Sequence, residues 1–436
     1  MRKIELLAPA GNREKLETVL HYGADAAYFG MQKYNLRKFA DNFSDAEVPD
    51  AVAYAHKLGK RLYATLNIIP FHSDLEDLPR AVQLLESAGV DGVIVSDLGV
   101  LDIVRENSSL PIHVSTQASN TNWRSVRQWH RLGAKRVVLA REVPIDDIRR
   151  IKDAVPEMEV EVFVHGAMCM AFSGHCFLSA HLANRDANSG GCAQSCRWRY
   201  AIVEQTRPGE YIPIEETERG TYVFNSRDLC TIEFLDKLLD AGVDSLKIEG
   251  RVKGIPYAAT TTKIYRDGLE RWKGRKFEVD SAWIDELMTV SNRGFTSGFF
   301  LGKPTVRDLN TTETQYYFTH VLAAKVEADL GNNEYVLWSR SPFYREMFTE
   351  WIPVEGVSRE ITFESFNNHE TGEPMNVAMP NYRVRVKCSE KLAVGDLLRQ
   401  PSADKEKAWN PKVQQWARDQ AWREKSWREK IIGDKK

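Results

Sequence analysis

Four of the six cysteines in the chain lie within one short stretch: Cys169, Cys176, Cys192 and Cys196. Their pattern is C-x6-C-x15-C-x3-C. Four thiolates can bind a structural zinc ion or an iron–sulfur cluster. Zinc sites favour two closely spaced pairs, and only the second pair here approaches that spacing. The wide first pair therefore favours a [4Fe–4S] cluster, with zinc as the alternative.

We expect a strand to position the first two of these cysteines at its end, because the apolar run Val160–Val164 comes just before them. Seven similar runs precede or follow it. The eight predicted strands are Ile4–Leu7, Ala26–Phe29, Arg61–Leu66, Gly92–Val95, Ile112–Ser115, Arg136–Leu139, Val160–Val164 and Ser245–Ile248.

Helix-like segments alternate with these strands and end in the recurrent phrases YGAD, AGVD, LGAK and AGVD. Glycine suits the position after the last turn of a helix, so each phrase predicts a helix end followed by a strand. Strands that alternate with helices predict a parallel sheet. Eight of them favour a (β/α)8-type parallel barrel, regular or irregular, over a doubly wound open sheet. A G-x-G-x-x-G motif after the first strand and a P-loop are both absent from the sequence, which argues against a dinucleotide or nucleoside triphosphate site.

Polar residues follow most of the predicted strands, at the end where barrel enzymes carry their chemistry. A single such residue often serves only loop contacts, but the ring as a whole predicts a site. The candidate catalytic residues are Asn67, Gln117, Arg141, Glu142, His165, Lys247, Glu249 and Arg251.

Lys247, Glu249 and Arg251 alternate along the last strand and its exit, so period-two geometry places all three on the face toward the barrel interior. Buried charges need partners. We therefore expect Lys247 and Arg251 to bind anionic groups, and Glu249 to orient one of them or to handle a proton. The alternative is a self-contained ion network of these three residues.

Several segments resemble the U-32 peptidase family, also called collagenase-like peptidases, over most of residues 1–310. They are ELLAPAG (Glu5–Gly11), YGADAAYFG (Tyr22–Gly30), NLR (Asn35–Arg37), HVSTQASNTNW (His113–Trp123), ARE (Ala140–Glu142), EVFVHGAMCMAFSGHCFLS (Glu161–Ser179), CRW (Cys196–Trp198), NSRDL (Asn225–Leu229) and SLKIEGR (Ser245–Arg251).

The resemblance is greatest to the branch that forms 5-hydroxyuridine at the tRNA wobble position. It implies an iron–sulfur protein that acts on RNA with prephenate as co-substrate. Prephenate carries two carboxylates, and a guanidinium group can pair with a carboxylate in bidentate fashion. Arg141, Lys247 and Arg251 are the expected partners of this small anion.

The length of 436 residues predicts two or three domains. We expect a barrel domain over 1–310, with the cysteine loop at 165–200 and a small β insertion at 200–225. A small β-barrel-like domain should follow over 311–401, because strand-like alternation and turns replace the helical segments. The tail 402–436 is basic and holds Trp409, Trp416, Trp422 and Trp427. Such a tail can track phosphates and stack bases, or can pack its tryptophans on the barrel.

The net charge is −2, so an RNA partner requires a local basic surface. The sequence shows no signal peptide and no long apolar span. Together with clustered cysteines, this predicts a cytoplasmic protein without a membrane segment. Protein partners are not indicated.

Three functions compete: a tRNA-hydroxylating iron–sulfur enzyme, a U-32-type peptidase and a zinc-stabilised RNA-binding protein. The peptidase motifs H-E-x-x-H and G-x-S-x-G are absent. A cysteine with His165 or His175 could supply a thiol and a base, but four clustered cysteines make better metal ligands.

Overall fold

The computed structural model describes residues 3–37, 41–169, 172, 175–176, 178–197, 216–217, 220–221, 227–273, 277–302 and 316–402. The predicted tail, apart from Ser402, lies outside these ranges. So does most of the predicted β insertion, of which the structure describes only the short antiparallel pair β8 (Glu216–Thr217) and β9 (Gly220–Thr221). The chain forms two compact units. Unit 1 comprises Met1–Leu287, Phe295–Gln315 and Pro353–Val357, and unit 2 comprises Met288–Gly294, Tyr316–Ile352 and Ser358–Lys436.

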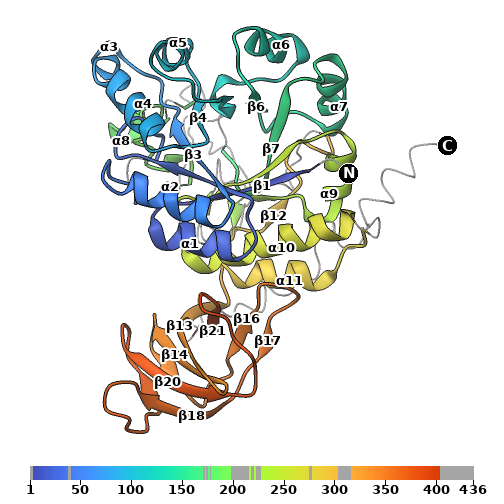
Figure 1. The fold of residues 1–436 in the computed structure, drawn as a ribbon. Coiled ribbons are helices and arrows are strands. Elements are labelled where there is room, and N and C mark those ends of the chain that lie inside the picture. Colours follow the sequence, from blue (N-terminus) through green and yellow to red (C-terminus); the bar gives the residue numbers. More distant parts are fainter. Residues whose placement is uncertain are drawn as a thin grey trace, which may run out of the picture. The chain divides into compact units, whose positions relative to one another are not determined.

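Unit 1 contains a closed parallel barrel (Figure 1). Strand β11 pairs in parallel with both β1 and β7, which closes the ring. The predicted (β/α)8-type barrel is confirmed, because all eight predicted strands form it. They are β1 (Glu5–Pro9), β2 (Ala26–Gly30), β3 (Arg61–Leu66), β4 (Gly92–Val95), β5 (Ile112–Val114), β6 (Arg136–Val138), β7 (Glu159–Ala167) and β11 (Ser245–Ile248).

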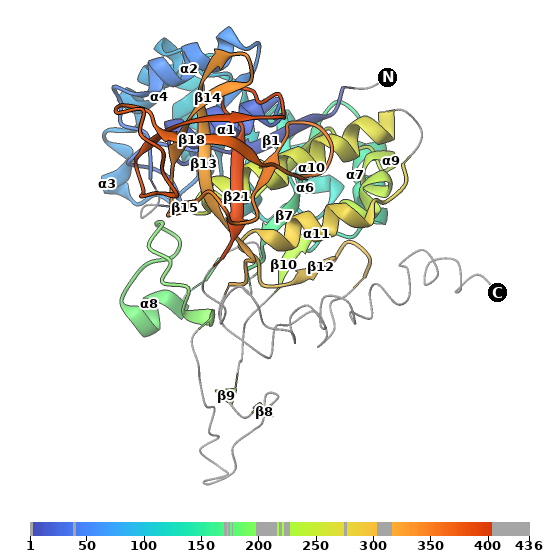
Figure 2. The ribbon, with the colours of Figure 1, turned by 90° about the horizontal axis from the view of Figure 1, so that it is seen from below.

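Helices connect successive strands on the outside of the ring. The described helices of this unit are α1 (Arg13–His21), α2 (Val48–Lys57), α3 (His72–Leu75), α4 (Leu78–Ser87), α5 (Leu98–Asn107), α6 (Trp123–Arg131), α7 (Ile145–Ala154), α8 (Leu178–Ala183), α9 (Leu235–Asp240), α10 (Ile255–Lys273) and α11 (Ser281–Thr289). Figure 2 shows α8 standing apart from the ring of barrel helices.

The recurrent glycine phrases have the predicted role. Gly23, Gly89, Gly133 and Gly242 follow helix ends with φ between 79° and 101°, a conformation that glycine adopts at little cost. The aspartate of three phrases adds a second function: the carboxylates of Asp25, Asp91 and Asp244 accept hydrogen bonds from the backbone N–H of Leu6, Leu62 and Val160. The phrase therefore ends a helix and fixes the start of a neighbouring strand.

The barrel is irregular between β7 and β11. Past the residues that pair with β6, β7 continues to Ala167 and pairs with the antiparallel strand β10 (Asp228–Cys230), which in turn pairs with β12 (Phe295–Thr296). The residues Asp228–Cys230 form a strand rather than the first turn of a helix, because they pair with the free edge of β7. The helix α9 begins at Leu235, after one 3-10 turn, Ile232–Phe234.

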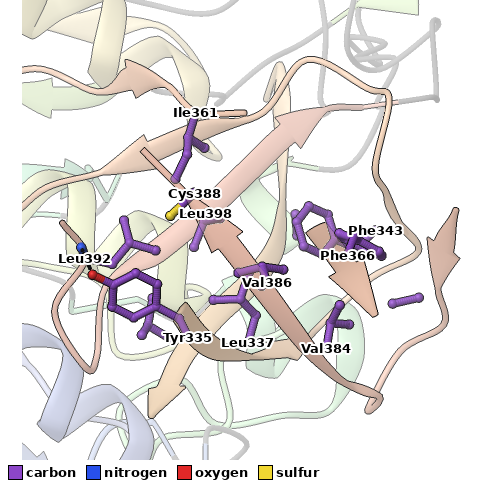
Figure 3. Close-up of a cluster of buried hydrophobic side chains, with 14 residues drawn as sticks. Tyr335, Leu337, Phe343, Ile361, Phe366, Val384, Val386, Cys388, Leu392 and Leu398 are labelled. Atoms are coloured by element: carbon purple, nitrogen blue, oxygen red, sulfur yellow. Dashed lines mark hydrogen bonds between the residues drawn. The ribbon is translucent and has the colours of Figure 1, made fainter. Parts of the chain in front are cut away.

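Unit 2 is built on an antiparallel sheet in the order β17-β16-β21-β13-β14-β20-β18, and this confirms the predicted C-terminal β-domain. Its strands are β13 (His320–Gly331), β14 (Glu334–Ser339), β16 (Glu350–Ile352), β17 (Arg359–Glu360), β18 (Phe363–Asn368), β20 (Arg383–Cys388) and β21 (Leu397–Pro401), and a separate pair is formed by β15 (Phe343–Tyr344) and β19 (Val377–Ala378). Figure 3 shows its core, in which Phe343 and Phe366 pack edge to face beside Val384 and Val386.

Among the described residues, no helix is both long enough and apolar enough to cross a membrane.

Candidate functional site

Strand β11 ends at Ile248, so Glu249 and Arg251 lie in the turn just beyond it, at the C-terminal mouth of the barrel. Lys247 lies one layer deeper. The three residues do not form the self-contained network that was weighed as an alternative, because each contacts a different set of partners. Lys247 pairs with Glu161, Glu249 with Arg37 and Arg141, and Arg251 with amide and hydroxyl oxygens.

Lys247 belongs to a buried charge network inside the barrel. Its Nζ lies 2.8 Å from Glu161 Oε1, and Arg136 Nη1 lies 3.0 Å from Glu161 Oε2. Arg136 also pairs with Glu5, which accepts a hydrogen bond of 2.9 Å from the Tyr63 hydroxyl. Burial raises the pKa of Glu161, but Lys247 and Arg136 outweigh it and the net pKa is lowered. Lys247 is thus neutralised by a protein carboxylate in this structure.

Arg251 is a buried cation held by neutral groups. Its Nη1 donates to Thr65 Oγ1 at 3.1 Å, and its Nη2 donates to Asn35 Oδ1 at 2.8 Å and to Asn42 Oδ1 at 2.5 Å. Within the described residues Arg251 forms no ion pair with a carboxylate. Burial lowers its pKa to about 10. A guanidinium group that is 97% buried and lacks an acidic partner is a candidate anion-binding group.

Glu249 faces two further guanidinium groups. Arg37, from the loop after β2, places Nη2 at 3.5 Å from Glu249 Oε1, and Arg141, after β6, places Nη2 at 3.8 Å from Glu249 Oε2. Burial raises the pKa of Glu249, yet Arg37, Arg141, Arg251 and Lys247 together lower it below its usual value. Glu249 is therefore ionised at neutral pH, and its lowered pKa makes it a weak base.

The balance of charge at the mouth is positive. Three guanidinium groups, those of Arg37, Arg141 and Arg251, act on the single carboxylate of Glu249, which leaves an excess of two positive charges in this group of four residues. Such an excess attracts a small dianion or a phosphate. The contacts of Arg141 fix its head group, because it donates to the Ala167 carbonyl oxygen and lies 4.0 Å from the centre of the Phe163 ring.

Several buried polar atoms at the same mouth have no hydrogen-bond partner within the described residues. They are Asn67 Oδ1, both side-chain polar atoms of Asn120, Arg141 Nε and Arg251 Nε. Asn67 otherwise donates weakly to Ser115 Oγ at 3.5 Å. Buried polar groups are normally paired, so unpaired ones at one edge of the barrel mark a place where a ligand can supply partners. Gln117, in the 3-10 turn Thr116–Ala118, and Glu142 are half-buried near the ends of β5 and β6.

The backbone of His165 accepts a hydrogen bond from the Glu249 N–H at 2.9 Å, but its ring lies among aromatic side chains. Its ring packs against Tyr257, Tyr265 and Phe295, with centroid distances between 5.4 and 5.8 Å. Burial lowers its pKa to about 3, so the imidazole is neutral at neutral pH. Its catalytic role stays a prediction, and its surroundings are those of a core histidine.

The cysteine segment lies over the residues that bind Arg251 and Glu249. A β-carbon at Gly190 would lie 2.7 Å from the Asn35 carbonyl oxygen, and Ile69 N–H donates to the Asn188 carbonyl oxygen at 3.3 Å. The pKa of Arg37 is raised by Glu249 and, to a smaller extent, by Cys192 and Cys169. These cysteines are therefore within electrostatic range of the positive mouth.

The cysteines of the segment supply the type of ligand that an iron–sulfur cluster or a zinc ion needs. All four cysteines are in the reduced form, and backbone N–H groups of Leu178 and Gln194 point at Cys176 Sγ and Cys192 Sγ at 3.3 and 3.4 Å. Such N–H···S contacts are typical around iron–sulfur clusters. The described side chains contain no preassembled group of three or more metal ligands, so the cluster stays a prediction. Cys230 and Cys388 are buried, and burial raises their pKa values to about 12 and about 11.

Sequence reasoning did not assign a role to Asn35, Arg37, Asn42 or Thr65, although these residues hold Arg251 and Glu249. The NLR segment was the available signal, because it contains Asn35 and Arg37 with one residue between them. Asn42 and Thr65 carry no local signal, since only the closed barrel brings them to Arg251.

Known proteins resemble the chain over the region that contains this site. The model of Peptidase family U32 matches residues 11–310. A relative named tRNA hydroxylation protein P1, from Bacillus subtilis (strain 168), is 36% identical over 405 residues, which cover 91% of this chain and 95% of that protein. A relative named Collagenase, from Porphyromonas gingivalis (strain ATCC BAA-308 / W83), is 33% identical over 312 residues, covering 69% of this chain and 74% of that protein. The solved structure of the U32 peptidase Mk0906 is 17% identical and covers 57% of this chain and 93% of its own, with a TM-score of 0.38.

Proposed function

Because the chain belongs to peptidase family U32, we propose that it hydroxylates tRNA, forming 5-hydroxyuridine at the wobble position in a prephenate-dependent reaction that uses a [4Fe–4S] cluster. The name of the relative that covers 91% of the chain supports action on tRNA. Such a substrate implies a cytoplasmic location. The observation that carries the proposal is the buried, positively charged mouth around Arg251, beside four reduced cysteines.

The chemistry of prephenate matches this charge. Arg251 and Arg141 bind its carboxylates, because two guanidinium groups with incomplete partners can form charge-assisted hydrogen bonds to a dianion. Glu249 stays ionised and orients Arg37 and Arg141, in keeping with its lowered pKa. Lys247 pairs with Glu161, so the charges of these two residues at the base of the site are balanced within the protein. The unpaired Oδ1 of Asn67 and the unpaired amide group of Asn120 suit the donor and acceptor edge of a uracil.

Cys169, Cys176, Cys192 and Cys196 would hold the cluster. When bound, a cluster of this kind supplies redox chemistry or, with an open iron, Lewis-acid activation. Zinc is the alternative occupant, and iron, sulfide and zinc analysis of anaerobically purified protein separates the two.

The peptidase alternative has the name of the Collagenase relative in its favour. It requires a base that activates a thiol. His165 does not favour that role, because its ring is buried among three aromatic rings and its pKa is lowered to about 3.

Mass spectrometry of tRNA nucleosides tests the proposal. A strain that lacks the gene should lose 5-hydroxyuridine at the wobble position, and a plasmid copy of the wild-type chain should restore it. Unchanged 5-hydroxyuridine in the deletion strain, with no other hydroxylation protein present, would reject the proposal.

A further inference from the structure

The segment between Glu106 and Glu142 contains no aspartate or glutamate, although the chain has 61 acidic residues. Its lysines and arginines are Arg124, Arg127, Arg131, Lys135, Arg136 and Arg141. Arg136 belongs to the buried network and Arg141 to the mouth. The other four lie on α6 and the loop that follows it, where all but the half-buried Arg127 are exposed. The segment therefore carries a local basic surface on a chain whose net charge is −2.

Two of these cations are gathered on one aromatic ring. Arg124 Cζ lies 4.6 Å and Arg127 Cζ 4.5 Å from the centre of the Trp123 ring. Within the part of the chain that the structure describes, neither guanidinium group forms an ion pair. Stacking on Trp123 orders both side chains without neutralising them. The pair is thus pre-organised to receive negative charge from a partner.

The position of α6 brings this pair to the barrel mouth. Helix α6 begins at Trp123, and its N-cap Asn122 comes shortly after the end of β5. Helices α3 and α5 begin in the same way after β3 and β4, with Phe71 and Asp97 as N-caps. Strands β3, β4 and β5 are neighbours, and Figure 1 shows α3, α5 and α6 along one side of the barrel.

Exposed apolar side chains accompany the cations at these helix starts. Phe71 is 65% exposed and Leu98, the first residue of α5, is 58% exposed. Neighbouring helices pack about 8–10 Å apart, so the three helix starts span on the order of 20 Å of rim. We define the rim as Phe71, Leu98, Trp123, Arg124 and Arg127.

We propose that this rim binds the tRNA substrate at the loop that carries the target uridine. Arg124 and Arg127 contact backbone phosphates, and Phe71 and Leu98 contact bases that are unstacked in the loop. RNA suits the rim because cations without acidic partners match phosphates, and exposed rings stack on unpaired bases. The inference rests on the proposed function and deepens it by naming the surface that presents the uridine to the mouth.

A matched pair of double variants of the full-length protein tests the rim. R124Q/R127Q removes two charges in the first turns of α6, near the mouth, and R131Q/K135Q removes two charges at the other end of α6 and in the loop that follows it. Binding to tRNA from the deletion strain is measured by fluorescence anisotropy over a range of salt concentrations. R124Q/R127Q should bind roughly tenfold more weakly, and the slope of log K against log salt should fall by about 1.4, the value for two single-strand phosphate contacts. R131Q/K135Q should bind like the wild type.

The outcomes separate the rim from the proposed function. If R124Q/R127Q binds tRNA as tightly as the wild type, or if both double variants weaken binding equally, the proposal for the rim alone is overturned. Wild-type protein that does not bind tRNA would overturn the proposed function together with the rim. Full tRNA affinity with lost hydroxylation in R124Q/R127Q would assign the rim to a protein partner instead, and would also overturn the inference. F71A provides an uncharged check, because it should weaken binding about tenfold, whereas L58A, at an exposed position after α2, should not.

Discussion

Gly30 provides the space that the guanidinium group of Arg251 occupies. A β-carbon at position 30 would lie 2.7 Å from Arg251 Cζ, closer than real β-carbons approach other atoms. Gly30 ends the strand β2, and Arg251 lies in the turn after β11. The AAYFG strand and the IEGR turn, which are 220 residues apart in the chain, are therefore two halves of one site.

Alanine at Gly30 should displace Arg251 from Thr65 and Asn35 without disturbing the barrel. We expect Gly30→Ala to lose most 5-hydroxyuridine formation in a complemented deletion strain, while its melting temperature stays within a few degrees of the wild type. Gly254→Ala is the control, because its β-carbon would meet its nearest atom at an ordinary 3.6 Å. Normal modification by Gly30→Ala would show that the position of Arg251 does not matter.

Lys247 and Glu161 should be coupled in stability. Lys247→Met leaves Glu161 buried with one cation fewer, and breaking a buried pair costs roughly 3 kcal/mol. The double variant Lys247→Met/Glu161→Gln should recover part of that loss. Denaturant unfolding of the four proteins in this cycle measures the coupling, and additive losses would contradict the pairing.

The same pair gives a prediction for pH. The pKa of Glu161 is lowered, so its contribution to wild-type stability is present above its unfolded pKa and is lost as the pH falls through the folded value. In Lys247→Met, burial acts against the charged carboxylate, so protonation relieves a cost. The stability difference between wild type and Lys247→Met should therefore narrow as the pH falls from 7 toward 4. A difference that widens over this range would mean that another group controls it.

The four clustered cysteines should differ from the two buried ones. Replacing Cys169, Cys176, Cys192 or Cys196 by Ala should remove iron, sulfide and the brown colour from anaerobically purified protein. Cys230→Ala and Cys388→Ala should keep them, because these thiols are buried and their pKa values are raised to about 12 and about 11. Iron that survives in a Cys192→Ala variant, or stoichiometric zinc in the wild type, would reject the cluster.

Most of the barrel could be predicted from the sequence because its signals are local. Each glycine phrase marks a helix end and the next strand, and the eight apolar runs are short and well bounded. The strand β10, which starts at Asp228, could not be predicted, because it depends on the free edge of β7, a long-range feature. The site was predictable in part. Barrel geometry places Arg141, Glu249 and Arg251 at the mouth, but the oxygens that hold Arg251 come from Asn35, Asn42 and Thr65, which only the folded ring brings together.

We expect the buried cation Arg251 to serve the reaction rather than the fold. Arg251→Gln should abolish 5-hydroxyuridine and leave the melting temperature nearly unchanged, since the residue forms no ion pair with a carboxylate in the described structure and its burial as a charge is costly. Arg266→Gln is the matched control, because Arg266 pairs with Asp25 away from the mouth. It should lower stability and keep the modification.

The most direct measurement is therefore the amount of 5-hydroxyuridine, by mass spectrometry, in tRNA from a deletion strain that expresses wild type, Arg251→Gln or Arg266→Gln at equal levels. We expect modification with wild type and Arg266→Gln and none with Arg251→Gln. Full modification by Arg251→Gln, or its loss only together with unfolding, would contradict this expectation.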